Sequence, residues 1–324
     1  MTTPTYIGLV VGAGAIGVEL EREPLRKKPA SHAAALVANP NTRLGGFVDS
    51  NPEALARAQT LFPGTPIFTD LKDALATVHP DIVIIATPPA SRLAIVELCC
   101  NAGVKYFICE KPLAGSVTEA EELKTLIERN EAILVLNYQR RFFPLFENAR
   151  REIKAGVLGT IQHVSAAYTN GLYNNGGHTI DALLFLLEQP LLVRGSLARP
   201  GLAPTGDLNI SALLETSSGT AISLVALDQS AYGIHEFIIY GTKGALVLSE
   251  YGYQKSNIPL APSSFAGVSR LAYEKSSTTL GEESMVAGAL TELLACISEH
   301  RQSRSGPENG VEVMRVLDAI HSML

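Results

Sequence analysis

Short apolar runs alternate with amphipathic segments from Tyr6 to Asn137. The apolar runs predict buried strands at 6–11, 43–48, 66–69, 81–86, 105–109 and 132–137. The segments between them predict helices at 53–61, 71–78, 92–102 and 117–129. Strands and helices that alternate in this way form a parallel sheet with helices on both faces. The pattern therefore predicts an α/β domain over residues 1–137, built on a doubly wound parallel sheet.

The pattern changes after residue 137. A helix that ends at Ala155 is followed by longer strands with a clearer alternation, at 161–170, 191–198, 208–216, 221–227, 236–240 and 245–248. Ser217 to Thr220 predict a hairpin turn, and two helices at 283–301 and 311–324 finish the chain. Residues 138–324 are therefore predicted to form an α+β domain with a large, mostly antiparallel sheet.

The first apolar run leads into a glycine-rich turn, Gly12-Ala13-Gly14-Ala15-Ile16-Gly17, with the spacing G-x-G-x-x-G. Gly12 would allow the tight turn, Gly14 would let a pyrophosphate approach the backbone, and Gly17 would let the next helix pack closely. The helix N-terminus would offer free N–H groups to the phosphates. These residues, Ala15 and Ile16 included, predict a Rossmann dinucleotide-binding site.

Asp49 ends the second predicted strand and indicates which dinucleotide binds. A carboxylate at this position accepts hydrogen bonds from the ribose hydroxyls and repels a 2′-phosphate, which favours NAD over NADP. Arg57 follows a few turns later, so NADP stays possible. The spacing from Gly17 is 49 − 17 = 32 positions, whereas about 20 is usual.

A polar insertion, Glu19 to Pro29, accounts for most of this excess. Pro24 and Pro29 would interrupt a regular helix, so we expect a loop here before Ser31 caps a helix at 32–38. The loop is either a solvent-facing insertion or a lid over the cofactor.

Two further motifs suggest chemistry. Thr87 and Pro88 close the fourth strand where a cofactor would lie, and Glu110-Lys111-Pro112 follows the fifth strand, either as a surface loop or as a lysine held at the active edge. His178 and Asp181 lie one turn apart at the start of an apolar helix. They are either a proton-transfer pair or a structural capping pair.

Together these pieces resemble the glucose-fructose oxidoreductase, inositol dehydrogenase and rhizopine-catabolism family (Gfo/Idh/MocA). The matching motifs span nearly the whole chain: Gly12 to Gly17, Asp49, Thr87-Pro88-Pro89, Glu110-Lys111-Pro112, Tyr138 with Arg141-Phe142, Gly156-Val157-Leu158-Gly159 and Gly177-His178-Thr179-Ile180-Asp181. The combination of Glu-Lys-Pro with Gly-x-His-x-x-Asp is far more specific than the glycine motif.

The resemblance implies an NAD(P)-dependent dehydrogenase or reductase that acts on a sugar, polyol or nucleotide-sugar. Lys111 would contact the substrate near the nicotinamide, Glu110 would belong to the cofactor site, and His178 would exchange the proton of the reacting hydroxyl. The proline after the lysine is commonly cis in the family, which Pro112 permits. The second domain would bind substrate and form the interface of a homodimer or homotetramer.

One position departs from the family pattern. Asn174 stands where many members carry an aspartate four residues before the histidine, and an amide cannot relay a proton. Either His178 and Lys111 suffice, with Asp181 orienting the imidazole, or the activity is not simple polyol oxidation. An NAD-dependent glycosidase with recycled cofactor and a non-catalytic dinucleotide-binding sensor are the alternatives. A polar and aromatic set suits a hydroxyl-rich substrate, and its aromatic members either contact substrate or pack in the core: Arg141, Tyr168, Asn170, Tyr173, Asn174 and Asn175.

Composition narrows the class of protein further. A net charge of −6 and a pI of about 5.7 disfavour a nucleic-acid partner. The four cysteines form no C-x-x-C pair, so we expect reduced thiols and no metal site. No signal peptide or membrane-spanning run is apparent, which predicts a cytoplasmic protein without a membrane partner.

Overall fold

The computed structural model describes residues 5–198 and 206–324, which divide into two compact units. The first unit comprises Met1–Gln139 and Glu283–Val311, and the second comprises Arg140–Glu282 and Glu312–Leu324. The first crossing, after Gln139, lies just beyond the predicted boundary at 137. The predicted second domain, 138–324, differs from the observed unit because the chain returns to the first unit at Glu283.

The first unit contains a parallel sheet with the strand order β3-β2-β1-β4-β5-β6. Its strands are β1 (Tyr6–Val11), β2 (Thr42–Val48), β3 (Ile67–Phe68), β4 (Ile82–Ile85), β5 (Tyr106–Cys109) and β6 (Ile133–Leu136). The strand order reverses between β1 and β4, and ligands of doubly wound sheets bind at such a switch point. The predicted fold class is confirmed.

Four helices of the first unit begin where the sequence provides a cap. The helices between the strands are α1 (His32–Ala38), α2 (Pro52–Leu61), α3 (Leu71–Val78), α4 (Arg92–Asn101) and α5 (Val117–Arg129). Side chains of Ser31, Asn51, Asp70 and Ser116 accept hydrogen bonds from N–H groups in the first turns of α1, α2, α3 and α5. The predicted helix at 32–38 is confirmed. The polar stretch before Ser31 is a loop, as predicted, except for a short 3-10 helix at Glu19–Arg22.

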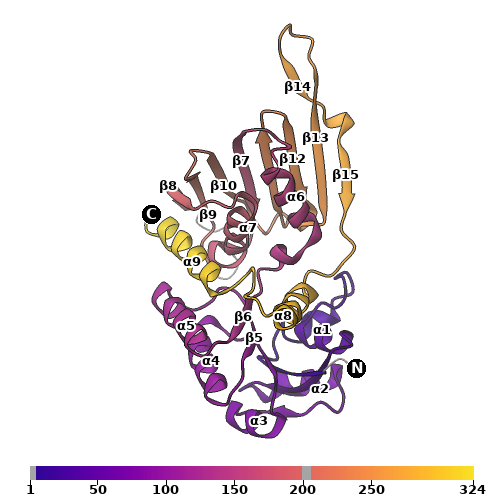
Figure 1. Cartoon of the computed structure of the whole chain (residues 1–324), viewed down its shortest axis with the longest axis vertical. Coiled ribbons are helices and arrows are strands. Elements are labelled where there is room, and N and C mark those ends of the chain that lie inside the picture. Colours follow the sequence, from indigo (N-terminus) through magenta and orange to yellow (C-terminus); the bar gives the residue numbers. More distant parts are fainter. Residues whose placement is uncertain (1–4, 199–205) are drawn as a thin grey trace. The chain divides into compact units, whose positions relative to one another are not determined.

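Helix α8 (Ala287–Glu299) also belongs to the first unit, although the strands of the second unit separate it from β6 along the chain. It lies beside α1 and packs on β5 and β6 (Figure 1). Leu290, Leu293 and Cys296 form its buried face. Burial of this face explains the return of the chain, since apolar area removed from water stabilises a fold by about 25 cal/mol per Å².

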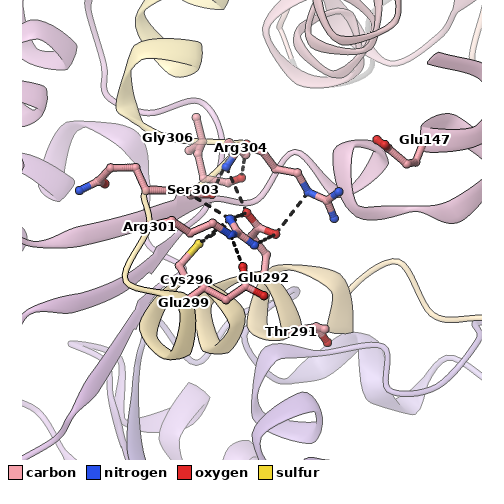
Figure 2. A network of polar contacts seen from close by, with 12 residues as sticks. Glu147, Thr291, Glu292, Cys296, Glu299, Arg301, Ser303, Arg304 and Gly306 are labelled. Atoms are coloured by element: carbon pink, nitrogen blue, oxygen red, sulfur yellow. Dashed lines mark hydrogen bonds and ion pairs between the residues drawn. The ribbon is translucent and has the colours of Figure 1, made fainter. Parts of the chain in front are cut away.

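A polar cluster fastens the segment after α8 (Figure 2). The Glu292 carboxylate is 4% exposed and accepts hydrogen bonds from Arg301 Nη1 at 2.8 Å and from Arg304 N at 3.1 Å. Burial alone would raise the pKa of Glu292, but the hydrogen bonds from Arg301 and Arg304 and their charges lower it. The fastened segment then pairs with β6, because Leu136 N donates to Ser305 O at 2.7 Å and Ser305 Oγ donates to Leu136 O at 2.8 Å.

The second unit contains a large sheet with the order β14-β13-β12-β11-β7-β10-β9-β8, and β15 pairs with β13. The strands are β7 (Ile161–Tyr168), β8 (Leu191–Ala198), β9 (Ile210–Thr216), β10 (Ala221–Ala226), β11 (His235–Gly241), β12 (Gly244–Ser249), β13 (Gln254–Pro262), β14 (Ser269–Leu271) and β15 (Ser277–Leu280). Among the described strands of this second sheet, only β7 and β10 pair in parallel. The sheet is therefore mostly antiparallel, as predicted.

Helices α6 (Pro144–Lys154) and α7 (Gly177–Leu187) pack together against this sheet (Figure 1), and α9 (Pro307–His321) ends the chain. The predicted hairpin turn at 217–220 joins β9 to β10. Strands β13 to β15 were not predicted, because Pro259 and Pro262 and a polar sequence obscure the alternation.

Among the described residues, no helix has the length and apolar character needed to cross a membrane. All four cysteines are free, and Cys99, Cys109 and Cys296 are buried. Burial raises the pKa of Cys99 and of Cys296 to about 12, so both stay protonated thiols near neutral pH.

Candidate active site

The three glycines of the phosphate loop have different surroundings. A Cβ on Gly12, whose φ is +102°, would lie 2.7 Å from the carbonyl carbon of Ala86, and a Cβ on Gly17 would lie 2.1 Å from Gly12 O. A Cβ on Gly14 would meet nothing within 4 Å. The chain's own packing therefore requires Gly12 and Gly17, whereas Gly14 borders open space. This arrangement fits a pyrophosphate that approaches the backbone at Gly14.

The polar insertion interrupts a helix without changing the register of the helix. His32 N donates to Ile16 O at 3.0 Å, and Ala33 N donates to Gly17 O at 3.1 Å. In an uninterrupted helix, the donor to Ile16 O would be the residue four positions later, at position 20. The insertion therefore displaces the donor by 32 − 20 = 12 positions. Without this displacement, the 32 positions between Gly17 and Asp49 become 32 − 12 = 20, which is the usual spacing.

Asp49 follows β2, and its carboxylate is hydrogen-bonded to the phosphate loop. Its Oδ2 accepts a hydrogen bond from Ala13 N at 2.8 Å, and its Oδ1 accepts one from Asn51 N at 2.9 Å. Each carboxylate oxygen has a further lone pair, so Asp49 can still accept a ribose hydroxyl. Arg57 contacts Glu19 of the polar insertion, with Nε 3.3 Å from Oε1. Arg57 is the cation that could have bound the 2′-phosphate of NADP, and in the structure its guanidinium is paired with the Glu19 carboxylate.

The Glu110-Lys111-Pro112 segment follows β5, and its Lys111–Pro112 peptide bond is cis, as the resemblance implies. Glu110 is 7% exposed; its Oε1 lies 2.8 Å from His32 Nε2 and accepts from Asn137 Nδ2 at 2.6 Å. Burial alone would raise the pKa of Glu110, but the hydrogen bonds from His32 and Asn137 and the nearby charges of His32 and Lys111 lower it. The carboxylate is thus ionised and held inside the first unit, which makes the motif more than a surface loop.

Thr87 and Pro88 follow β4, next to β5 in the sheet. The Thr87 hydroxyl accepts a hydrogen bond from Ser91 Oγ at 2.9 Å, and the Thr87 carbonyl accepts from the guanidinium of Arg92. Gly12, Asp49, Thr87 and Glu110 all follow parallel strands of one sheet, so they share its carboxyl edge.

In the second unit, His178 is half-buried near the start of α7. A π-helical turn, Gly171–Gly176, precedes it and carries Tyr173 and Asn174. Asp207 holds this turn, because its Oδ1 accepts from Tyr173 N at 3.3 Å and its Oδ2 accepts from Asn174 N at 2.9 Å. Turns of this kind are rare and occur frequently at functional sites.

Asp181 and Arg141 form a buried ion pair in the second unit. Arg141 Nε donates to Asp181 Oδ1 at 2.7 Å, and the two side chains are 7% and 1% exposed. Asp181 Oδ2 has no hydrogen-bond partner within the described residues. Burial raises the pKa of Asp181 to about 6, although Arg141 opposes the shift. Orientation of His178 by Asp181 and substrate contact by Arg141 stay predictions.

The two tyrosines of the predicted substrate set differ. Tyr168 is fully buried, and its hydroxyl donates to Ile210 O at 2.8 Å and accepts from Ile210 N at 3.2 Å. Of the two alternatives for Tyr168, the structure supports packing, because its ring and hydroxyl belong to the core. Tyr173 is half-buried, and its hydroxyl lies 3.4 Å from Asp318 Oδ1. Burial and the Asp318 carboxylate raise the pKa of Tyr173 to about 12.

The sequence reasoning assigned no role to several residues of these networks, among them His32, Arg92, Asn137 and Asp207. His32 and Arg92 open helices and contact residues 78 and 18 to 20 positions away, which no local pattern reveals. A charged residue that begins a mostly apolar helix, three positions after Pro89, was the available signal for Arg92.

The phosphate loop, the acidic residue after β2 and the doubly wound sheet define a nicotinamide-dinucleotide-binding protein. A family model described as an oxidoreductase family with an NAD-binding Rossmann fold matches residues 8–138. A second model, the GFO/IDH/MocA C-terminal domain, matches residues 170–247. The chain belongs to the Gfo/Idh/MocA family and is an NAD(P)-dependent oxidoreductase.

Curated relatives include two inositol 2-dehydrogenases. The protein from Rhizobium meliloti strain 1021 is 29% identical over 239 residues, which cover 66% of this chain and 70% of the relative. The protein from Rhodococcus erythropolis strain PR4 is 31% identical over 192 residues, which cover 52% of this chain and 54% of the relative.

Solved structures share the fold over the whole chain. KijD10, a 3-ketoreductase from Actinomadura kijaniata crystallised as a mutant with TDP-benzene and NADP, has a TM-score of 0.79 at 18% identity and covers 98% of each chain. GenD2 from gentamicin A biosynthesis, crystallised with NAD, has a TM-score of 0.78 at 20% identity and covers 99% of this chain and 94% of that chain.

Proposed function

We propose that this protein transfers a hydride between NAD(P) and a hydroxyl or keto carbon of a sugar, polyol or nucleotide-sugar. The observation that carries the proposal is the buried network around Glu110, which fixes the segment that bears Lys111 at the carboxyl edge of the sheet. The inositol 2-dehydrogenases among its relatives support the substrate class.

A bound nicotinamide dinucleotide supplies the hydride acceptor or donor. The open space at Gly14 suits its pyrophosphate, and Asp49 suits the adenosine ribose. Ala15, Ile16, Thr87, Pro88 and Glu110 complete the proposed cofactor site. We expect NAD to bind more tightly than NADP, since Asp49 would repel a 2′-phosphate and Arg57 is paired with Glu19.

In the proposed reaction, Lys111 and His178 have different roles at the reacting hydroxyl. The Lys111 ammonium would donate a hydrogen bond to the reacting oxygen, and the His178 imidazole would accept the hydroxyl proton as the hydride leaves the same carbon. The reverse reaction returns that proton from His178 to the new hydroxyl. Asn174 cannot relay this proton. Arg141, Tyr173 and Asp181 would support or contact substrate in the second unit.

The test is turnover by the purified protein with NAD+ or NADP+ across sugars, inositols and nucleotide sugars. Lys111→Ala and His178→Ala should each lower kcat by about 10²- to 10⁴-fold. If both groups act on one hydroxyl, the double variant should lose much less than the product of the two effects. Tight cofactor binding without net reduced nicotinamide on any substrate would contradict the proposal and favour the recycled-cofactor glycosidase or the sensor.

We also propose that the second unit forms a homodimer or homotetramer through its sheet. Leu192, Leu197 and Leu213 are 48%, 59% and 49% exposed on the neighbouring strands β8 and β9. Exposed apolar side chains that lie together are a frequent mark of a protein interface. Light scattering after size exclusion should give two or four copies, and Leu213→Glu should lower that number.

A further inference from the structure

The side chain of Arg92 binds the backbone on both sides of Lys111. Arg92 is the first residue of α4 and is 3% exposed. Its Nε and Nη2 donate to Thr87 O at 3.1 and 2.8 Å. Its Nη2 also donates to Lys111 O at 3.4 Å, and its Nη1 donates to Glu110 O and to Pro112 O. One guanidinium therefore holds the carbonyls of three consecutive residues.

This arrangement uses the whole donor capacity of the side chain. A guanidinium has five N–H donors in a planar fork, and five hydrogen bonds to backbone carbonyls are present. Buried arginines are usually paired with carboxylates, yet none of the hydrogen-bond partners of Arg92 in the described residues is a carboxylate. The guanidinium thus contacts the backbone carbonyls on both sides of Lys111.

The carbonyls that Arg92 binds come from the ends of two adjacent strands. Thr87 follows β4, Glu110 follows β5, and the two strands pair in parallel. Arg92 thus fixes the position of Lys111 relative to Thr87, at the edge of the sheet where a dinucleotide binds. His32 and Asn137 act on a different part of the motif, the carboxylate of Glu110.

We propose that Arg92 is a positioning residue, which sets the place of the Lys111 backbone and through it the ammonium group. The consequence for catalysis rests on the function proposed above for Lys111, whereas the placement itself does not. A lysine at position 92 cannot replace the arginine, because an ammonium is a point donor that cannot reach carbonyls on both strands.

The experiment measures the chemical reactivity of Lys111 directly. Pulse labelling with an amine reagent, followed by peptide mass spectrometry, gives the labelling rate of Lys111 against pH, with the exposed Lys72 in the same unit as internal reference. In Arg92→Ala and Arg92→Lys, the rate ratio of Lys111 to Lys72 should change by about threefold or more, which corresponds to a pKa shift of about half a unit. Guanidinium ions at tens of millimolar should restore the ratio in Arg92→Ala.

A matched control separates placement from general loss of stability. Arg301→Ala weakens the Glu292 cluster of the same unit without touching residues 110–112, so it should lower the melting temperature and leave the Lys111 ratio unchanged. Folded Arg92 variants with wild-type Lys111 labelling, or an equal change in Arg301→Ala, would overturn the proposal.

Kinetics then test the consequence for the reaction. With an active substrate, Arg92→Ala should lower kcat by about 10- to 100-fold, with a smaller change in the KM for substrate, and guanidinium should recover part of the loss. An unchanged kcat in a variant with altered Lys111 labelling would refute the proposed role of Lys111 and leave the placement intact. The failure of one proposal is thus distinguishable from the failure of the other.

Discussion

Substitution of Gly14 by alanine should abolish tight dinucleotide binding and leave the fold unharmed. The new Cβ meets no atom within 4 Å, and the φ of Gly14 lies outside the left-handed region. The unfolded state loses entropy, so stability should be unchanged or rise by up to about 1 kcal/mol. In the complex, the methyl group would occupy the space of a phosphate oxygen. Loss of one charge-assisted hydrogen bond costs about 1.5–3 kcal/mol, which weakens NAD+ affinity about 10- to 150-fold.

Gly17→Ala is the matched control, since its Cβ would lie 2.1 Å from a backbone oxygen that cannot move aside. This variant should lose about 1–3 kcal/mol of stability. Urea unfolding followed by circular dichroism measures the stability, and calorimetric titration measures NAD+ binding, because the chain has no tryptophan to report it. Wild-type NAD+ affinity in Gly14→Ala, or equal destabilisation of both variants, would refute the assignment of this space to the pyrophosphate.

Three further predictions concern charged groups. Asp49→Ser should weaken NAD+ binding by about tenfold and narrow its preference over NADP+ in titrations, because a carboxylate that repels a 2′-phosphate is removed; an unchanged preference would contradict the role of Asp49. The pKa of Asp181 is about 6 in the folded protein, above its ordinary value of 3.8, so the folded state binds this proton more tightly. The Asp181 contribution to the free energy of unfolding is therefore largest below pH ~4 and falls by about 3 kcal/mol as the pH rises to about 6. The free energies of unfolding of wild type and Asp181→Asn, measured by urea titration, should diverge across this pH window. Parallel curves of free energy against pH would contradict the raised pKa of Asp181. Glu292→Gln should cost about 2–3 kcal/mol of stability, because two arginines lose a buried partner, whereas Glu299→Gln, 59% exposed, should cost less than about 1 kcal/mol; equal losses would show that burial of Glu292 does not matter.

Local patterns predicted most of the elements, and contacts between distant residues explain what they missed. The periodicity that predicted residues 71–78 and 117–129 as helices is complete within each segment, and the structure has helices at these residues. The return of α8 to the first unit depends on surfaces of β5, β6 and α1 that form only in the folded chain.

The candidate site likewise has some residues that local patterns indicate and others that depend on contacts between distant residues. Gly12, Gly14, Gly17 and Asp49 could be proposed from the sequence, because the chemistry of phosphate and ribose dictates residue types at nearly fixed spacing. The polar insertion obscured that spacing but left the helix register unchanged. Arg92 was not predictable, because an arginine at the start of a helix does not reveal which carbonyls it will reach.

Contacts join three neighbouring pairs of strands at the carboxyl edge of the first sheet. Asp49 after β2 accepts from Ala13 after β1, Gly12 after β1 packs against Ala86 after β4, and Arg92 joins the carbonyls after β4 to those after β5. These contacts follow the strand order β2-β1-β4-β5 without a gap. Four loops that are separate in the sequence thereby act as one surface. A change at any of these contacts should therefore alter dinucleotide binding, even where the changed side chain does not touch the ligand.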